Sequence, residues 1–383
     1  MINLSKVILP GQTIGIIGGG QLGKMMTLSA KAMGYRVTVL DPTPDCPCGQ
    51  VADEQIVGAY NDLSAIEQLA RKCDVITYEF ENIDAEALEW LTNNTYVPQG
   101  TEILRITQNR IYEKAAIQEA GAPVAPYRVI EKKEDLELAI GELQLPVVLK
   151  TATGGYDGKG QVVIKTIEDV KQALPLIQHG ACVLEKWIAF KKELSVIITK
   201  NSNGDATVFP VAENIHKNNI LHMTIAPARI NDAIKEEAIR AAKQIADKLE
   251  LVGTLAVELF LTEDDKIFIN ELAPRPHNSG HFSIEACITS QFEQHIRAVC
   301  NLPLGSTEIV KPAVMVNILG QHVEPLLTNL NNFKEWKIHL YGKSEAKHNR
   351  KMGHITRLCE THEEALAEID NDMTFGKEQS HAN

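Results

Sequence analysis

The chain of 383 residues is too long for one hydrophobic core, so two or three domains are expected. Its 50 acidic and 38 basic residues give a formal net charge of −12, which argues against nucleic acid or an anionic membrane as a partner. Seven scattered cysteines, no apolar run of membrane-spanning length and no signal-peptide pattern together predict a cytoplasmic protein.

Residues 13–41 are typical of a strand, a glycine loop, a helix and a second strand. The loop fits the G-x-G-x-x-G pattern through Gly18, Gly20 and Gly23, and Asp41 ends the second strand. That spacing matches a dinucleotide-binding fingerprint, but nothing downstream resembles a hydride-transfer site. Because a glycine loop at a helix N-terminus binds any phosphate through free backbone N–H groups, we favour a substrate phosphate here.

The alternation of strands and helices continues to about residue 100. A helix is expected over Leu63–Lys72, and a strand over Val75–Phe80 ends among Glu79 and Glu81. Residues 1–100 are therefore predicted to form a doubly wound domain, with these carboxylates at the sheet edge where ligands bind.

A helical pattern over residues 101–120 stops at Gly121, and a compact αβ unit follows from about 124 to 185. At its centre two strands are joined by the glycine-rich loop 154–160, which lacks the G-K-[ST] ending of a Walker motif. The pattern predicts a flap whose backbone amides close over ATP phosphates. Lys150, at the end of the preceding strand, would reach those phosphates as a point charge.

Residues after the flap extend this candidate nucleotide site. The segment 185–188 would offer backbone hydrogen bonds and an apolar wall to an adenine, and Glu193 would face the ribose hydroxyls. His216 lies in a polar loop, where a lone histidine is usually structural.

The stretch Thr254–His281 carries the strongest signal for chemistry. A two-residue hairpin loop at Asp264-Asp265 would set the cross-strand pairs Thr262–Ile267, Phe260–Ile269 and Glu258–Glu271. Both glutamates then project from one face, and two like charges this close repel unless a cation lies between them. Oxygen-only ligation suits Mg²⁺, which completes its shell with substrate phosphates. Strict alternation turns Asn270 to the opposite face.

A rigid polar loop follows the hairpin, with Arg275, His277, Asn278, Ser279 and His281 between prolines. Its place beside the carboxylate pair predicts a catalytic loop. A helix near residues 284–301 should end this region, and short strands with one more helix, near 362–370, should follow. Cations around Lys343 and Arg350 form either a solvated basic turn or an anion site for a substrate phosphate.

With these motifs the chain resembles the ATP-grasp superfamily and, within it, the 5-(carboxyamino)imidazole ribonucleotide synthases of purine biosynthesis. The resemblance runs through GGGQLGKM, DPTPDCPCGQVAD, TYEFENI, GGYDGKGQ, EKWIAFKKELSVI, NELAPRPHNSGH, YGK and RKMGHITRL, of which the last three are specific to this family.

The resemblance implies an α/β and α+β fold with a Rossmann-like pre-ATP-grasp domain. The implied units are a pre-ATP-grasp domain (1–100), a linker helix and ATP-grasp lid (101–185), an ATP-grasp C-terminal core (186–305), a small β-rich subdomain (306–375) and a disordered tail (376–383). It also implies an ATP- and bicarbonate-dependent carboxylation of the amine of 5-aminoimidazole ribonucleotide through carboxyphosphate, with release of ADP and phosphate, and a homodimer. The alternatives are another ATP-grasp ligase such as a formate-dependent ribonucleotide transformylase or a biotin carboxylase, an NAD-dependent dehydrogenase, and an inactive nucleotide-binding regulator.

Residue roles follow from the resemblance, and Mg²⁺ would be held by Glu258 and Glu271. The residues implied to contact ATP are Arg110, Lys150, Gly155, Tyr156, Asp157, Gly158, Lys159, Gly160, Gln161, Glu185, Lys186, Trp187, Ile188, Glu193, His216, Asn270 and Glu271. Those implied to bind bicarbonate and act in catalysis are Arg275, His277, Asn278 and Lys343, with His277 as a hypothetical relay for the amine proton. Those implied to hold the ribonucleotide are Gly20, Gln21, Leu22, Glu79, Tyr156 and Arg350.

Overall fold

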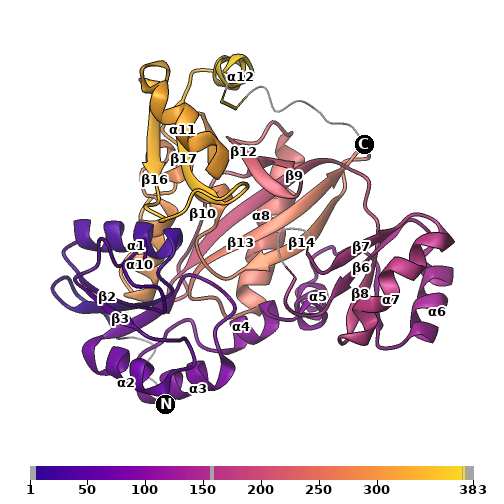
Figure 1. The fold of residues 1–383 in the computed structure, drawn as a ribbon, viewed down its shortest axis with the longest axis horizontal. Coiled ribbons are helices and arrows are strands. Elements are labelled where there is room, and N and C mark those ends of the chain that lie inside the picture. The colour runs from indigo at the N-terminus through magenta and orange to yellow at the C-terminus, as the bar shows by residue number, and fades with distance from the viewer. Residues whose placement is uncertain (1–5, 156–158, 373, 376–383) are drawn as a thin grey trace.

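The computed structural model describes residues 6–155, 159–372 and 374–375, arranged as three lobes around a central sheet (Figure 1). The predictions made for Tyr156, Asp157, Gly158 and the tail 376–383 concern residues outside these ranges. None of the helices in the described ranges combines the length and apolar character that crossing a membrane requires.

The first lobe is the predicted doubly wound domain. Its elements are β1 (Thr13–Ile17), α1 (Gln21–Ala32), β2 (Arg36–Asp41), β3 (Glu54–Val57), α2 (Leu63–Lys72), β4 (Val75–Tyr78) and α3 (Ala85–Asn94). The strands form a parallel sheet in the order β3-β2-β1-β4. Successive side chains bury on opposite faces: Ile16 packs with α1, whereas Ile17 packs with α2 and α3.

The linker contains two helices where the sequence predicted one over residues 101–120. They are α4 (Glu102–Thr107) and α5 (Arg110–Glu119). The break is explained by Asn109, whose side chain accepts a hydrogen bond from Ile111 N at 2.9 Å and so caps α5. This break places Arg110 in the first turn of α5.

The lid is the small lobe at the right of Figure 1. It contains β5 (Tyr127–Ile130), α6 (Lys133–Leu143), β6 (Val147–Thr151), β7 (Gln161–Ile164), η1 (Ile167–Asp169), α7 (Val170–Gln178) and β8 (Cys182–Lys186). The order β5-β8-β6-β7 is antiparallel, and β6 and β7 flank the glycine-rich loop as predicted.

A nine-stranded antiparallel sheet forms the centre and the third lobe. Its first part has β9 (Phe190–Lys200), β10 (Ala206–Val208), β11 (Ala212–Lys217), β12 (Ile220–Ala226), α8 (Asp232–Lys248), β13 (Gly253–Thr262) and β14 (Ile267–Ala273). Its second part has η2 (Asn278–Gly280), α9 (Ser283–Ala286), α10 (Gln291–Val299), β15 (Ala313–Leu319), α11 (Gly320–Thr328), η3 (Leu330–Phe333), β16 (Trp336–Leu340), β17 (Lys351–Leu358) and α12 (His362–Asn371). The strand order is β14-β13-β9-β11-β12-β15-β17-β16, with β10 on β9.

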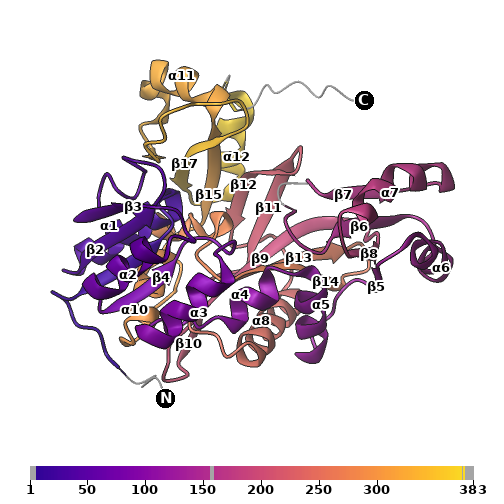
Figure 2. The ribbon, with the colours of Figure 1, turned by 60° about the horizontal axis from the view of Figure 1, so that its bottom comes forward.

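Packing around this sheet joins the lobes. The alanine-rich face of α8, which includes Ala238 and Ala242, packs on the apolar residues of β9 and β13. The predicted single helix over 284–301 is wrong: α9 and α10 are separate, and the Ser290 side chain caps α10 by accepting from Glu293 N. The apolar face of α10 covers α1, so a helix late in the chain completes the core of the first lobe. β15 pairs with β12, so the last strands extend the central sheet (Figure 2).

Candidate active site

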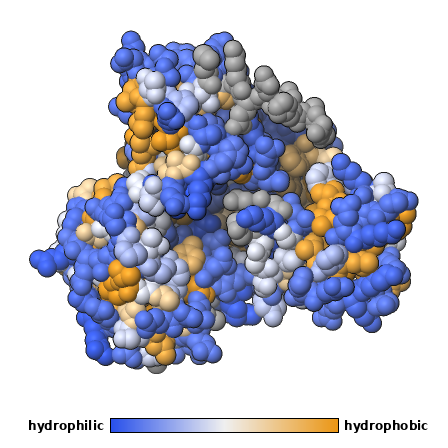
Figure 3. Space-filling model, in the orientation of Figure 1, coloured by the Kyte–Doolittle hydropathy of each residue, from blue (hydrophilic) through white to orange (hydrophobic). Residues whose placement is uncertain are grey.

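A cavity of about 570 Å³ lies where the first lobe, the lid and the central sheet meet. Figure 3 shows the molecule hollowed between its lobes on this side. The predicted residues that line the cavity are Gln21, Leu22, Glu79, Arg110, Lys150, Gly155, Lys159, Gln161, Glu185, Lys186, Trp187, Ile188, Glu193, His216, Glu258, Asn270, Glu271, Arg275, His277 and Asn278. The structure thus brings together residues that are more than 250 positions apart in the chain.

The β13–β14 hairpin places the two predicted metal-binding glutamates opposite each other. The pair Glu258–Glu271 is confirmed, but the register then shifts by one residue. The predicted pairs Phe260–Ile269 and Thr262–Ile267 are wrong, because Phe260 faces Phe268 and Leu261 faces Ile267. The turn is also one residue longer than predicted: Thr262 N bonds Lys266 O, and Asp265 has a left-handed φ of 59°.

The register shift is a β-bulge at Asn270. This residue has no partner on β13, so Asn270 and Glu271 both face the cavity, against the strict alternation expected from sequence. Groups distant in sequence hold the bulge in place. Lys114 Nζ donates to Asn270 O at 3.1 Å, and Ile269 N donates to Pro123 O at 2.8 Å.

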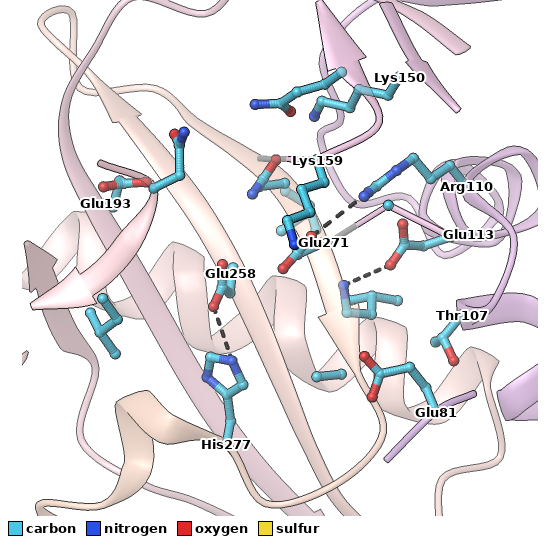
Figure 4. A pocket seen from close by; sticks show the side chains of 18 of the residues that line it. Glu81, Thr107, Arg110, Glu113, Lys150, Lys159, Glu193, Glu258, Glu271 and His277 are labelled. Carbon is cyan, nitrogen blue, oxygen red and sulfur yellow. Dashed lines mark hydrogen bonds and ion pairs between the residues drawn. The ribbon is translucent and has the colours of Figure 1, made fainter. Parts of the chain in front are cut away.

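The glutamate pair has the electrostatics of a cation site. Burial and the neighbouring Glu271 raise the pKa of Glu258 to about 8. Arg110 Nη1 lies 3.7 Å from Glu271 Oε2, and His277 Nε2 lies 3.3 Å from Glu258 Oε1 (Figure 4). Among the described residues no group of three or more His, Cys, Asp or Glu could hold a metal. Two carboxylates with further oxygens from a substrate match the usual shell of Mg²⁺.

A buried charge cluster under the lid was missed by sequence analysis. Glu185 lies 3.2 Å from both Lys150 and Lys114, and Lys114 is fully buried. The sequence did contain a signal for this cluster: Lys114 lies one helical turn before Ile117, on the apolar face of α5, where a lysine needs a buried partner. The cluster ties α5 to the lid strand that carries Glu185.

The predicted adenine segment is only partly free for ligand bonds. Lys186 N donates to Pro126 O at 2.8 Å and Trp187 N to Pro146 O at 3.2 Å, so an adenine would bond other backbone groups of residues 185–188. Phe190 stacks on Phe260 with ring centroids 4.5 Å apart, and both rings line the cavity. This stack supplies an apolar wall that the sequence pattern did not reveal.

His216 has a partner that sequence analysis could not assign. Its Nδ1 lies 2.7 Å from Glu193 Oε2 at the ribose end of the predicted nucleotide site. Burial lowers the pKa of His216, but the hydrogen bond to Glu193 and the charges of Glu193 and Glu258 together outweigh burial and raise it overall. The pair therefore acts as one unit that orients the Glu193 carboxylate.

The glycine loop before α1 differs from the predicted phosphate cradle. Gly20 N and Gly23 N donate to the Glu79 carboxylate, the latter at 2.6 Å, and Gly19 N donates to Asp41 at 2.7 Å. Carboxylates therefore occupy amides that were expected to be free for a phosphate, because the helix N-terminus favours any nearby anion. Asp41 also accepts from Tyr60 Oη at 2.7 Å, which leaves it poorly placed for the ribose of a dinucleotide.

The catalytic loop predicted after β14 faces the carboxylate pair. His277 Nδ1 accepts from Ser279 N at 3.3 Å, which assigns the imidazole proton to Nε2, toward Glu258. Burial and the charge of Arg275 hold the pKa of His277 well below its ordinary value, so the ring is neutral. Neutral His277 therefore presents an Nε2–H donor to the cavity, and its role as a relay for the amine proton stays a prediction.

Two further predicted site residues, Lys343 and Arg350, are not among the residues that line the cavity. Lys343 Nζ donates to Lys351 O at 2.8 Å, and burial followed by the charge of Arg350 lowers the pKa of Lys343 to about 8. The turn before it docks on the first lobe: Lys24 Nζ donates to Tyr341 O at 3.0 Å. The charges of both Arg350 and Glu79 influence the pKa of Lys343, so these three side chains are near one another. Lys343 and Arg350 therefore form a positively charged group on the side of the glycine loop, which Glu79 binds.

Comparisons with known proteins cover nearly the whole chain. Family profiles match at residues 11–108 (ribonucleotide synthetase pre-ATP-grasp domain), 115–292 (ATP-grasp domain) and 313–368 (phosphoribosylaminoimidazole carboxylase C-terminal domain). The N5-carboxyaminoimidazole ribonucleotide synthase of Bacillus subtilis (strain 168) is 57% identical over 366 residues, 96% of each protein.

Two solved structures are similar over the same extent. The N5-carboxyaminoimidazole synthetase of Staphylococcus aureus, complexed with ADP, has a TM-score of 0.91 at 46% identity, covering 95% of this chain and 97% of that one. The synthase of Aspergillus clavatus, in complex with ADP and 5-aminoimidazole ribonucleotide, has a TM-score of 0.87 at 34% identity, covering 94% and 96%.

Proposed function

Because the chain belongs to the ATP-grasp N5-carboxyaminoimidazole ribonucleotide synthases of purine biosynthesis, we propose how its own residues divide the carboxylation between them. ATP would lie between the lid and the central sheet, and 5-aminoimidazole ribonucleotide would lie against the first lobe. The observation that carries this arrangement is the Glu258–Glu271 pair, which lines one cavity together with Lys150 of the lid and with Arg275 and His277 of the loop after β14.

The chemistry proposed for this cavity proceeds in two balanced steps. A bicarbonate oxygen attacks the γ-phosphorus of ATP, forming carboxyphosphate and releasing ADP. The ribonucleotide amine then attacks the carboxyl carbon, the carbon–oxygen bond to phosphate breaks, and the departing phosphate takes the amine proton to leave the N-carboxylated product. Carboxyphosphate is labile in water, so enclosure by the lid serves to exclude solvent.

Each group of residues would have one task in this scheme. Mg²⁺, held by Glu258 and Glu271, would neutralise negative charge on the transferring phosphoryl group. Lys150 adds a fixed positive charge from the lid, and the position of Arg110 beside Glu271 supports the same role. His277, as an Nε2–H donor, would orient bicarbonate, with Arg275 and Asn278 beside it.

The ribonucleotide phosphate is assigned to the cations of Lys343 and Arg350, because the glycine-loop amides already bind carboxylates. Gln21, Leu22 and Glu79 line the cavity on this side and would contact the remainder of that substrate. The backbone of Gly20 would serve by fixing Gln21 at the start of α1.

The test is release of ADP with MgATP and bicarbonate, with and without 5-aminoimidazole ribonucleotide. Strong stimulation by the ribonucleotide, with N-carboxylated product formed in equal amount, is expected. Stimulation by formate in place of bicarbonate would instead identify a transformylase. Turnover without any ribonucleotide requirement would contradict the proposed acceptor. The expected homodimer is a separate prediction, tested by sedimentation, as is a cytoplasmic location, tested by cell fractionation.

The pH dependence of ribonucleotide use should report Lys343. Its pKa of about 8 means that the ammonium is charged below that pH and neutral above it. If this charge binds the substrate phosphate, kcat/KM for the ribonucleotide should fall above pH 8, approaching about tenfold per pH unit. Lys343→Arg keeps the charge and should move the fall to higher pH.

The control for Lys343 is Lys347→Arg, on the same turn, where the exposed lysine pairs with Glu345 at 2.7 Å. That variant should reproduce the native pH profile. If kcat/KM for the ribonucleotide falls over the same pH range in Lys343→Arg as in the native protein, a group other than Lys343 is titrating.

A further inference from the structure

The Arg275 guanidinium is held by a carboxylate from another lobe. Arg275 Nε donates to Glu81 Oε2 at 2.6 Å and Nη2 donates to Glu81 Oε1 at 3.2 Å, a two-point ion pair. Glu81 follows β4 in the first lobe, whereas Arg275 follows β14 of the central sheet. Both residues line the cavity, and Glu81 is drawn at its lower edge in Figure 4.

The backbone at each end of this pair is fixed by side-chain amides. Gln108 Nε2, at the break between α4 and α5, donates to Glu81 O at 2.6 Å. Gln99 Nε2 donates to Pro274 O at 3.3 Å, directly before Arg275. The ion pair therefore joins two anchored segments, so the direction of the guanidinium is set by Glu81.

The pair leaves one edge of the guanidinium for a ligand. Arg275 has five N–H donors, of which Nε and one on Nη2 go to Glu81, and one on Nη1 goes to Pro276 O at 3.3 Å. Within the described residues, one hydrogen on each of Nη1 and Nη2 has no acceptor. Two parallel donors on one planar edge match two oxygens of a planar carboxylate-type anion.

We propose that Glu81 is a positioning residue for bicarbonate: it holds the Nε/Nη2 edge of Arg275, so that the Nη1/Nη2 edge receives two bicarbonate oxygens. This inference rests on the proposed role of Arg275 in bicarbonate binding. Burial raises the pKa of Glu81, but the charge of Arg275 and the hydrogen bonds that Arg275 donates together lower it overall, so the carboxylate stays ionised. Glu79, two residues earlier, holds the glycine loop, so one short segment supports both the ribonucleotide side and the bicarbonate side.

The experiment measures KM for bicarbonate, ATP and the ribonucleotide in Glu81→Gln, Arg275→Lys and the double variant. Glu81→Gln keeps the size of the side chain but loses its charge and one acceptor. It should raise KM for bicarbonate about tenfold or more and leave KM for ATP within about twofold. In the Arg275→Lys background, which has no planar fork, Glu81→Gln should add less than about twofold.

Glu102→Gln is the matched control, because Glu102 makes the same two-point pair with Arg105 on the exposed surface. It should leave every kinetic constant unchanged. If Glu81→Gln does not fold, as judged by its melting curve, Glu81→Asp supplies the same comparison with a shorter carboxylate.

The outcomes distinguish the positioning role of Glu81 from the bicarbonate-binding role of Arg275. An unchanged KM for bicarbonate in folded Glu81→Gln, beside a raised KM in Arg275→Lys, overturns the positioning role alone. An unchanged KM in Arg275→Lys overturns the bicarbonate role of Arg275 and the inference with it. Additive effects in the double variant would mean that Glu81 contacts a substrate itself, which also overturns the inference.

Discussion

Glu258→Gln is expected to lower kcat by about a thousandfold or more and, at the same time, to raise the melting temperature of the metal-free protein. The loss of activity follows from removing one of two carboxylates proposed to hold Mg²⁺, on which neutralisation of the phosphoryl group depends. The amide oxygen still accepts from His277 Nε2, so the local hydrogen bond is retained.

The gain in stability follows from the raised pKa of Glu258. The ordinary pKa of a glutamate, about 4.3, applies to the unfolded chain, whereas the folded value is about 8. Between these values the folded protein holds a proton that the unfolded chain has lost, so stability falls as pH rises through the window. Glutamine removes this effect, and at pH 8 the melting temperature should rise by about 2 °C or more.

The measurement is thermal unfolding with and without MgCl₂ and ATP, beside steady-state kinetics. Native protein should be stabilised by MgATP more than by ATP alone, and the variant should lose that difference. Glu263→Gln, exposed at the turn of the same hairpin, is the control and should change neither property. Retained turnover in Glu258→Gln would contradict the metal site, and a lower melting temperature would contradict the electrostatic argument.

Lys114→Met is expected to destabilise the protein by about 3–5 kcal/mol, because it removes one partner from a buried ion cluster. Methionine has a similar length but cannot donate. Glu185 would keep only Lys150, and the bulge carbonyl of Asn270 would lose its donor at 3.1 Å. Since that bulge turns both Asn270 and Glu271 into the cavity, KM for ATP should also rise about tenfold.

Urea denaturation gives the change in free energy of unfolding, and hydrogen–deuterium exchange shows where it arises. Faster exchange should be concentrated in β8 and β14, the two strands that Lys114 joins. Lys248→Met is the matched control, because its exposed pair with Glu119 at 2.8 Å should contribute less than about 1 kcal/mol. If Lys114→Met and Lys248→Met lower the free energy of unfolding equally, the buried cluster contributes no more to stability than an exposed ion pair.

Local patterns were sufficient for much of the fold. β2 ends at Asp41 and α2 spans Leu63–Lys72 as predicted, and the strand–loop–strand lid and doubly wound domain are present. These elements depend on periodicity, glycine positions and caps, which neighbouring residues determine. No prediction covered α3 or α11. The two longest predicted helices that failed are each interrupted, and in each the second helix begins after a capping residue, Asn109 or Ser290.

In the candidate active site, too, local sequence patterns predicted some features and long-range contacts determined the others. Sequence alone identified the chemical groups: the acid pair Glu258–Glu271, the polar loop after β14, and a lysine before a glycine flap. It could not identify partners supplied by distant segments, such as Glu81 for Arg275 or Glu79 for the glycine-loop amides. Those contacts form between residues 56 to 194 positions apart.

Residue order alone was therefore enough to identify which side chains could perform the chemistry and which local elements carry them. The directions of these side chains depend on contacts between segments that are distant in the chain. The bulge at Asn270 exists because Lys114 and Pro123, far away in the chain, bond the backbone on either side of it, and a one-residue shift reverses which face a strand residue presents. Burial in turn set the charge states of Glu258 and His277, since desolvation depends on everything packed around a group.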